Sequence, residues 1–274
     1  MIPDDVTRIG DNAFYYCSTL TGELVIPEQI TSIGKYAFEK CTGLTGSLVI
    51  PNTVVELGES AFGNCSGFDG TLTLSENLTY IGSWTFEECA GFKGSLVIPN
   101  SVTSIGSSAF EGCHGFDGTL TLSKGLTSIE SFAFASCDGF MDAVIYAEVP
   151  PTLGNYSFGG FGSTKLTVPC GCVSVYENSD WSEQFTNIIE DCTLVSENED
   201  NGMSVYPNPT HGMVRIEAEG INNICIFNLL GEKVFESAVS GDAFEFDFGS
   251  LEKGLYLIRI ETAEGFSTEI VTVM

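Results

Sequence analysis

The chain has 274 residues, among them 37 acidic and 10 basic side chains, and a formal net charge of −27 at pH 7. A surface this acidic repels nucleic-acid phosphates and anionic lipid headgroups, which makes nucleic acid and bare membrane poor partners. No segment approaches the roughly 18 consecutive apolar residues of a membrane-spanning helix, and Pro3-Asp4-Asp5 stand where a signal peptide would be apolar.

A 24-residue period runs through the first half of the chain. Six cysteines keep this step without an insertion, namely Cys17, Cys41, Cys65, Cys89, Cys113 and Cys137. Six phenylalanines keep it as well, namely Phe14, Phe38, Phe62, Phe86, Phe110 and Phe134. Such a repeat indicates a solenoid of stacked coils, each of which buries its apolar side only against its neighbours. The first repeat opens at Ile2-Pro3 without its leading Leu-Val, so we expect residue 1 to lie inside a longer natural chain.

Each coil is predicted to hold two short strands and a turn. The first strand is Leu24-Val25-Ile26 and its equivalents, and the alternation of side chains turns Leu24 and Ile26 inward and Val25 outward. Pro27 ends this strand, and a second extended run follows at 30–33. Residues 37–41 are too few for more than a helical turn. We therefore expect a mostly β solenoid with short helical turns, a leucine-rich-repeat superhelix, with coils about 4.8 Å apart.

The repeat also has a recognisable pattern, I-G-x-x-A-F-x-x-C-x-x-L. It is present as Ile33-Gly34, Ala37-Phe38, Cys41 and Leu44, and it resembles the BspA-like leucine-rich repeat. Six copies keep phase over residues 1–140, with mild departures such as Thr85 in place of Ala. The resemblance implies a cell-surface protein, of a kind found in bacteria and some protozoa, that mediates adhesion.

The ten cysteines are predicted to fall into two groups, buried thiols and residues suited to a disulfide. Parallel side chains in neighbouring coils keep their Cβ atoms about 4.8 Å apart, whereas a disulfide needs about 3.8 Å, so the six periodic cysteines are predicted to form a ladder of buried thiols. No His or second Cys accompanies each of them, which argues against metal. Three others fall outside the period, and a disulfide from Cys170 or Cys172 to Cys192 is expected. Cys225 is predicted to be a lone buried thiol.

Residues 141–192 are expected to form variant repeats and a C-terminal cap. The 24-residue phase breaks after Phe140, Leu166-Thr167-Val168-Pro169 repeats the first strand once more, and Trp181 lies in a segment suited to closing the last coil. Solenoids need such atypical terminal units to cover their last apolar face. The polar residues 193–203 are interpreted as a linker.

Residues 204–274 are predicted to form a small β-sandwich. Short apolar or alternating runs, among them 214–218, 224–227, 244–248 and 255–260, are separated by glycines at roughly ten-residue spacing. The tail opens with Val205-Tyr206-Pro207-Asn208-Pro209-Thr210-His211-Gly212 and later carries Gly231, Gly254 and Tyr256. It closely resembles the type A C-terminal sorting domain of the type IX (Por) secretion system.

That second resemblance implies a Bacteroidetes source and export across the outer membrane. It further implies contact with the secretion machinery and removal of the tail, with the protein then anchored at the cell surface or released. One departure is that the family often ends in a strand with basic residues, whereas here the last six residues are Glu269-Ile270-Val271-Thr272-Val273-Met274.

Catalytic constellations are not found in the sequence. The two histidines, His114 and His211, lack the orienting partners that a Ser-His-Asp or Cys-His unit requires. Phosphate-cradling and dinucleotide patterns fail as well. We therefore expect a protein that is not an enzyme and uses no cofactor or metal.

A binding surface is the better candidate. One position of the repeat carries Tyr36, Trp84 and Phe132 on every second coil, about 10 Å apart by the strand spacing. If exposed, these rings could stack on glycans or anchor a host protein; the alternative is that they pack over the turn. The leading hypothesis is an exported surface protein for adhesion, and the competing one is a structural spacer without a specific ligand.

Overall fold

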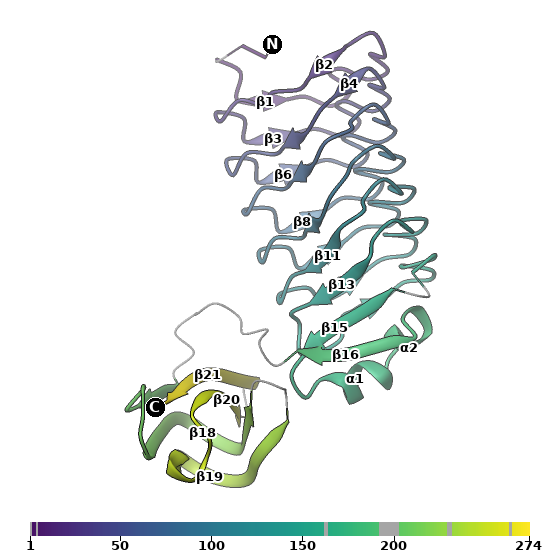
Figure 1. Ribbon diagram of the computed structural model, residues 1–274. Helices are drawn as coiled ribbons and strands as arrows, with labels where there is room; N and C mark the ends of the chain where they lie inside the picture. The colour runs from purple at the N-terminus through teal and green to yellow at the C-terminus, as the bar shows by residue number, and fades with distance from the viewer. Residues whose placement is uncertain (1, 4, 162–163, 192–202, 229–231, 263–264) are drawn as a thin grey trace. The chain divides into compact units, whose positions relative to one another are not determined.

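The computed structural model describes residues 1–274 apart from 1, 4, 162–163, 192–202, 229–231 and 263–264. Two compact units are present, one comprising 1–168 and 172–189 and the other 169–171 and 190–274. The first is a β-solenoid of about eight turns and the second is a curled antiparallel sheet (Figure 1). The predicted linker at 193–203 lies outside the described residues, apart from Met203.

Two columns of short parallel strands run along the solenoid. The second-strand column consists of β1 (Arg8–Ile9), β3 (Ser32–Ile33) and β6 (Glu56–Leu57), followed by β8 (Tyr80–Ile81), β10 (Ser104–Ile105), β12 (Ser128–Ile129) and β14 (Thr152–Leu153). The first-strand column consists of β2 (Gly22–Glu23) with β4 (Leu44–Thr45), β5 (Leu48–Val49) with β7 (Leu72–Thr73), and then β9 (Leu96–Val97), β11 (Thr119–Leu122), β13 (Asp142–Ile145), β15 (Lys165–Pro169) and β16 (Asn187–Asp191). Leu48 is fully buried and Val49 is 54% exposed, as the alternation predicts.

The strand pairing follows the repeat. Leu48 lies opposite Leu72 and Ile33 opposite Leu57, each one repeat further along the chain. Two details differ from expectation. In the first coil the paired residues are those of β2, which precede the predicted strand at 24–26. The phase breaks after Phe140 as expected, since Ala143 of β13 pairs with Leu120 after a step of one residue less, but it recovers at β14, where Leu153 pairs with Ile129.

Phenylalanine rings form the centre of the solenoid. Seven of them stack face to face in one ladder, with centroids 4.9–5.7 Å apart, namely Phe14, Phe38, Phe62, Phe86, Phe110, Phe134 and Phe158. A second ladder joins Phe68, Phe92, Phe116 and Phe140 at 5.1–5.9 Å. These rings are buried apart from Phe14, so the ladders run through the continuous core of the stacked coils.

The turn around each phenylalanine of the first ladder is not helical. Around Phe38, for example, Tyr36 has a φ of 57° and Lys40 a φ of 60°. This left-handed conformation interrupts the expected helical turn. In this turn, backbone amides donate hydrogen bonds along the axis of the stack. The N–H groups of Tyr36, Phe38 and Lys40 donate to carbonyls of the following coil at 2.9, 2.7 and 2.8 Å.

Aromatic residues close the last coil. Between β15 and β16 lie two short helices, α1 (Val173–Glu177) and α2 (Trp181–Gln184). Trp181 is fully buried, and its ring centroid lies 5.1 Å from that of Phe158. Its Nε1 donates to the Pro151 carbonyl at 2.8 Å. Tyr176 is buried beside it and donates to the Ala147 carbonyl at 2.7 Å. The helices therefore cover the end of the phenylalanine ladders.

The tail is a single curled sheet with a core of its own. Its elements are β17 (Ser204–Tyr206), β18 (Met213–Asn228), β19 (Lys233–Asp247), the 3-10 turn η1 (Phe248–Ser250), β20 (Gly254–Thr262) and β21 (Gly265–Val273). A small sandwich of short strands was predicted, but two of those strands, 214–218 and 224–227, are one strand here. Register shifts after Glu217 and a left-handed Gly220 bend β18 without ending it. The curl gathers Ile216, Ile226 and Ile258 into one core.

Replacing a ladder phenylalanine should destabilise the solenoid strongly. Phe110 is fully buried between Phe86 and Phe134, so Phe110→Ala should lower the free energy of unfolding by about 3–5 kcal/mol. Phe132→Ala removes the same ring where it is 41% exposed and should cost under about 1.5 kcal/mol. Denaturant unfolding of both variants checks this, and equal losses would contradict the ladder as the core.

Candidate functional site

The three aromatic residues proposed for ligand contact share one left-handed backbone position. The φ angles of Tyr36, Trp84 and Phe132 are 57°, 56° and 61°. The equivalent residues in the other coils are Asn12, Ser60, Ser108 and Tyr156, also with positive φ. A residue other than glycine pays about 1–2 kcal/mol in this conformation, and a bulky one is uncommon there. Backbone preference therefore does not explain why rings stand at this position.

The rings are only partly covered. Trp84 is 39% exposed, Phe132 is 41% exposed and Tyr36 is half-buried, whereas the intervening Ser60 and Ser108 are buried. Large and small side chains thus alternate from Tyr36 to Phe132, and the serines between the rings are buried. Each of the three rings is therefore partly covered and partly exposed to solvent.

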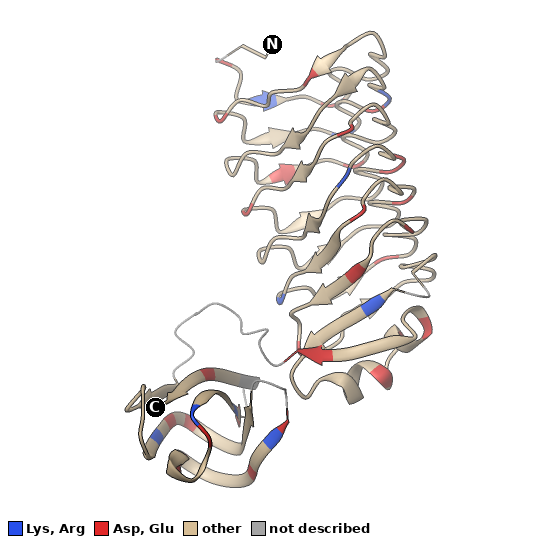
Figure 2. Ribbon diagram, viewed as in Figure 1, with Lys and Arg blue, Asp and Glu red and all other residues tan. Residues whose placement is uncertain are grey.

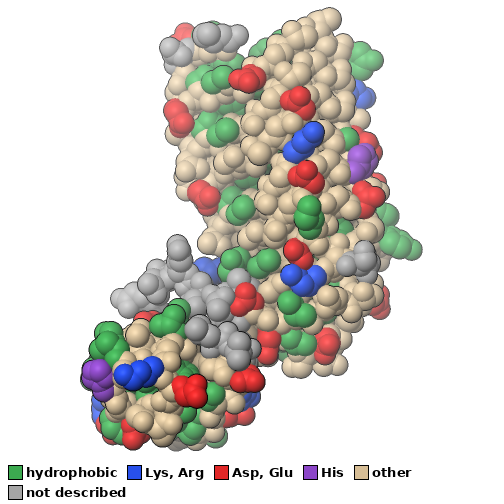
Figure 3. Space-filling view, viewed as in Figure 1, with side chains coloured by type: hydrophobic (Ala, Val, Ile, Leu, Met, Phe, Trp, Pro, Cys, Tyr) green, Lys and Arg blue, Asp and Glu red, His purple; other side chains and the backbone are tan. Residues whose placement is uncertain are grey.

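A fourth aromatic residue belongs to this row. Tyr156 occupies the equivalent position one repeat after Phe132, is 66% exposed and stacks on Phe132 with centroids 5.6 Å apart. The repeat itself would have located it, but the phase was expected to break after Phe140. We call Tyr36, Trp84, Phe132 and Tyr156 the aromatic edge. On the face seen in Figure 3, exposed hydrophobic side chains stand as separate groups rather than as one large patch.

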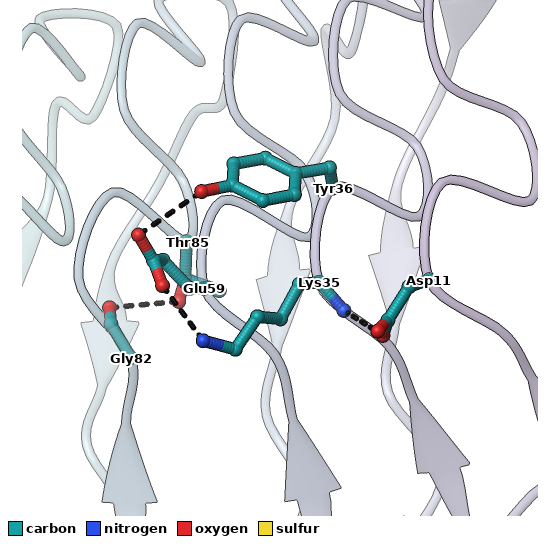
Figure 4. Close-up of polar contacts among 6 residues, drawn as sticks. All are labelled: Asp11, Lys35, Tyr36, Glu59, Gly82 and Thr85. Atoms are coloured by element: carbon teal, nitrogen blue, oxygen red, sulfur yellow. Dashed lines mark hydrogen bonds and ion pairs between the residues drawn. The ribbon is translucent and has the colours of Figure 1, made fainter.

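Polar contacts fix the first member of the aromatic edge. The Tyr36 hydroxyl donates to Glu59 Oε1 at 3.1 Å and Lys35 Nζ donates to Glu59 Oε2 at 3.0 Å (Figure 4). The hydrogen bond from Lys35 lowers the pKa of Glu59, and the bond to Glu59 raises the pKa of Tyr36. Asp11 accepts from the Lys35 backbone amide at 2.8 Å. The Tyr36 ring is thereby directed along the axis toward the next coil.

The same close-up explains a departure from the repeat. Thr85 replaces the usual alanine, and its buried hydroxyl donates to the Gly82 carbonyl at 2.7 Å. Acidic side chains are spread along the coils (Figure 2), without gathering at one end. Glu87, next to Phe86, has its pKa raised by burial and by the neighbouring Glu111 and Glu88. The surroundings of the aromatic edge are thus unfavourable for an anionic ligand.

Histidine is the side chain most often used in acid–base catalysis and metal binding, and the chain has two. In that part of the chain no group of three His, Cys, Asp or Glu side chains is placed to hold a metal ion. His114 Nδ1 lies 3.1 Å from the Ser136 carbonyl and His211 Nδ1 lies 3.0 Å from the Met274 carbonyl. Both rings therefore contact backbone oxygens.

The periodic cysteines carry thiols that donate hydrogen bonds. Cys65 Sγ donates to the Phe38 carbonyl at 3.0 Å and Cys89 Sγ to the Phe62 carbonyl at 3.1 Å. Three other rungs make the same bond, at 2.9–3.1 Å, namely Cys41, Cys113 and Cys137. The sequence predicts these residues to be small apolar fillers, but their thiols also give a carbonyl of the preceding coil a second donor. Burial raises the pKa of Cys89 to about 12 and raises that of Cys65 too.

The other cysteines differ from the ladder. Cys170 is disulfide-bonded and Cys172 carries a buried thiol. Cys192, the partner expected for one of them, lies outside the described residues. Cys225 is a thiol in β18, half-buried rather than buried as expected.

The residues of the sorting motif lie in and after β17 and in β20. Tyr206 ends β17 and is 45% exposed, while Thr210 is buried, and its hydroxyl accepts from the Gly212 amide at 3.0 Å. Tyr256 in β20 is buried against Phe248. Gly254 begins β20, and Gly231 lies outside the described residues. The residues around Asn208, which include Pro207 and Pro209, run alongside the end of β21.

Comparison with known proteins assigns both units. The profile of the BspA type leucine rich repeat region matches six times, over residues 1–117 and 91–187. The profile of the secretion system C-terminal sorting domain matches residues 204–273. The chain therefore belongs to the BspA-type leucine-rich-repeat family and ends in a type IX sorting domain. That domain indicates export to the cell surface or the extracellular space.

A solved structure from T. pallidum supports the solenoid fold. A leucine-rich repeat protein of T. pallidum is 28% identical, with 58% of this chain and 72% of that chain covered and a TM-score of 0.50. A leucine-rich repeat protein from Bacteroides ovatus is 17% identical, with 69% and 82% covered and a TM-score of 0.22. No curated protein matches the chain. Within the described residues, no helix has the length and apolar character needed to cross a membrane.

Alkaline pH should destabilise the solenoid through four of its thiols. Burial raises the folded pKa of Cys41, Cys65, Cys89 and Cys113 above the unfolded value of about 8.5. Above that pH the unfolded chain loses these protons first, and the free energy of unfolding falls by up to about 1.4 kcal/mol per pH unit per thiol. Cys89→Ser keeps a hydroxyl donor for the Phe62 carbonyl but removes one such thiol. Its urea unfolding should show a shallower decline between about pH 9 and pH 11 than the parent chain.

A matched control is Thr85→Ala, which restores the alanine of the other coils beside the ladder and removes no thiol. Its slope should stay closer to that of the parent chain. If Cys89→Ser and the parent chain declined equally, the thiols would not be the buried groups that titrate.

Proposed function

We propose that this exported solenoid is a surface binding protein for adhesion and that the aromatic edge contacts the ligand. The observation that carries the proposal is that Trp84, Phe132 and Tyr156 stand partly exposed at a left-handed position that disfavours bulky residues. Backbone strain that is retained in a fold often marks a functional position. Exposed aromatic rings are also the side chains most often found at binding hot spots.

The net charge of the chain limits the chemical class of the ligand. The net charge is −27, Glu59 accepts from the Tyr36 hydroxyl and the Glu87 amide donates to the Trp84 carbonyl, so an anionic polymer would be repelled. An uncharged glycan, whose apolar face stacks on aromatic rings, or an uncharged or basic protein surface fits these residues. Either ligand would lie along several coils, because the rings recur along the axis of the stack.

A structural spacer is the second candidate, and hydrogen bonds at the start of strands in the first-strand column support it. There the hydroxyl of Ser47 accepts from the Thr71 amide at 2.9 Å, and that of Ser95 accepts from the Thr119 amide at 3.0 Å. Such hydroxyls stabilise the stack itself rather than a bound partner. We propose no catalytic activity for either role.

Replacing two rings by the serine that other coils carry tests the binding proposal. Trp84→Ser with Phe132→Ser should leave the protein folded and lower its affinity for an array-identified glycan or protein about tenfold or more, since each exposed anchor contributes roughly 1–2 kcal/mol. Val97→Thr, which makes this exposed strand residue like Thr73 and Thr121, is the control and should bind normally.

Three outcomes separate the alternatives. Loss of affinity in the double variant alone supports the aromatic edge. Unchanged affinity would remove the aromatic edge from the binding surface. A parent chain that binds nothing on glycan and host-protein arrays would favour the spacer.

A further inference from the structure

The segment that follows β17 is hydrogen-bonded along the end of β21. The Asn208 side chain donates from Nδ2 to the Ile270 carbonyl at 2.6 Å and accepts at Oδ1 from the Thr272 amide at 3.0 Å. The Thr210 backbone amide donates to the Thr272 carbonyl at 2.8 Å, and the Thr210 carbonyl accepts from the Met274 amide at 2.9 Å. We call Asn208 and Thr210 the strand clamp.

The strand clamp takes the place of another strand at the edge of the sheet. Hydrogen bonds to β20 occupy one edge of β21, with Leu255 opposite Thr272 and Leu257 opposite Ile270. The strand clamp occupies the other edge, where the amide of Asn208 serves as donor and acceptor in the way a peptide group does. An open edge invites pairing with other chains, and the last residues of a strand tend to fray. The clamp fixes these residues although they lie far from it in the sequence.

The clamped residues present an uncharged face. Val271 and Val273 are buried in the core of the tail, so the alternation of side chains turns Ile270 and Met274 outward. Ile270 is 42% exposed and Met274 is 48% exposed, and Leu255, on the same face of the sheet, is 40% exposed. We call Leu255, Ile270 and Met274 the outer apolar face. In a chain with a net charge of −27, three neighbouring exposed side chains without charge are a distinct feature.

We propose that the outer apolar face, held by the strand clamp, is where the sorting domain contacts the secretion machinery, with Asn208 as the positioning residue. The partner surface is apolar and uncharged, because the outward residues of this strand carry no basic side chain that an acidic surface would attract. The Pro-Asn-Pro-Thr segment at the start of the tail and the strand at its end therefore act as one composite signal. This inference rests on the sorting-domain family and not on the aromatic edge.

Two variants of the full chain separate positioning from contact. Asn208→Ala removes both side-chain bonds, so amide hydrogen exchange at Thr272 should become roughly tenfold faster or more, while the amides of β20 stay protected. Export of this variant by cells with a type IX system should fall about as much. Ile270→Ala keeps the clamp, so it should show normal exchange at Thr272 but reduced export.

Asn222→Ala is the matched control, because Asn222 is an exposed asparagine of β18 in the same sheet. It should exchange and export like the parent chain. Faster exchange with normal export of Asn208→Ala would mean that the clamp only covers a sheet edge, and would overturn the proposal. Normal export of Ile270→Ala would overturn the outer apolar face as the contact. If Asn208→Ala unfolded the whole tail, the Ile270→Ala result would decide alone.

Discussion

The solenoid depends on hydrogen bonds between equivalent turns of successive coils. In six successive coils, from Asn12 to Ser136, the amides of the residues equivalent to Tyr36, Phe38 and Lys40 point along the axis and donate to the next coil. The left-handed conformation at the first and third of these positions accompanies this arrangement. Buried backbone groups must find partners, and these bonds satisfy them at the part of the coil that lacks β-strands. Any insertion in the turn would shift all three bonds together, which is why the repeat keeps a constant step there.

The inward side chains follow from the same constraint. Because equivalent residues lie one above another, rings at one position must stack, and the phenylalanine ladders result. The carbonyl of each ladder phenylalanine from Phe14 to Phe110 has a thiol of the next coil as an additional donor. A cysteine is small enough for the crowded interior and still able to donate, so one residue type meets two needs. The outward side chains are not needed for this stacking or for these hydrogen bonds, which leaves them available for binding.

Much of the solenoid could be predicted from the sequence because its period is short and repeated six times. The inward and outward sides of the first strand, the buried cysteines and the family followed from position in the repeat. The left-handed turn could not be predicted, since Tyr, Trp and Phe at residues 36, 84 and 132 argue against that conformation. The single curled sheet was missed because the glycine and bulges that bend β18 resemble strand ends. The bonds of Asn208 join residues with no local pattern between them.

The two functional units rest on one shared feature, a backbone whose edges are satisfied by hydrogen bonds. In the solenoid the turns supply these bonds, and in the tail a side-chain amide does. The aromatic edge and the outer apolar face are then surfaces that the fold holds in place without requiring their side chains for the stacking or pairing itself. Their composition can therefore be set by a ligand or by the secretion machinery.

The most direct test of this account is amide hydrogen exchange at the turn positions of a central coil. If the turn bonds hold the stack together, the amides of Ser60, Phe62 and Asn64 should be as strongly protected as those of the core strands and should exchange only when the solenoid unfolds. Exchange at the rate of exposed loops, with the strands still protected, would contradict the account, because the coils would then be held by their sheets alone.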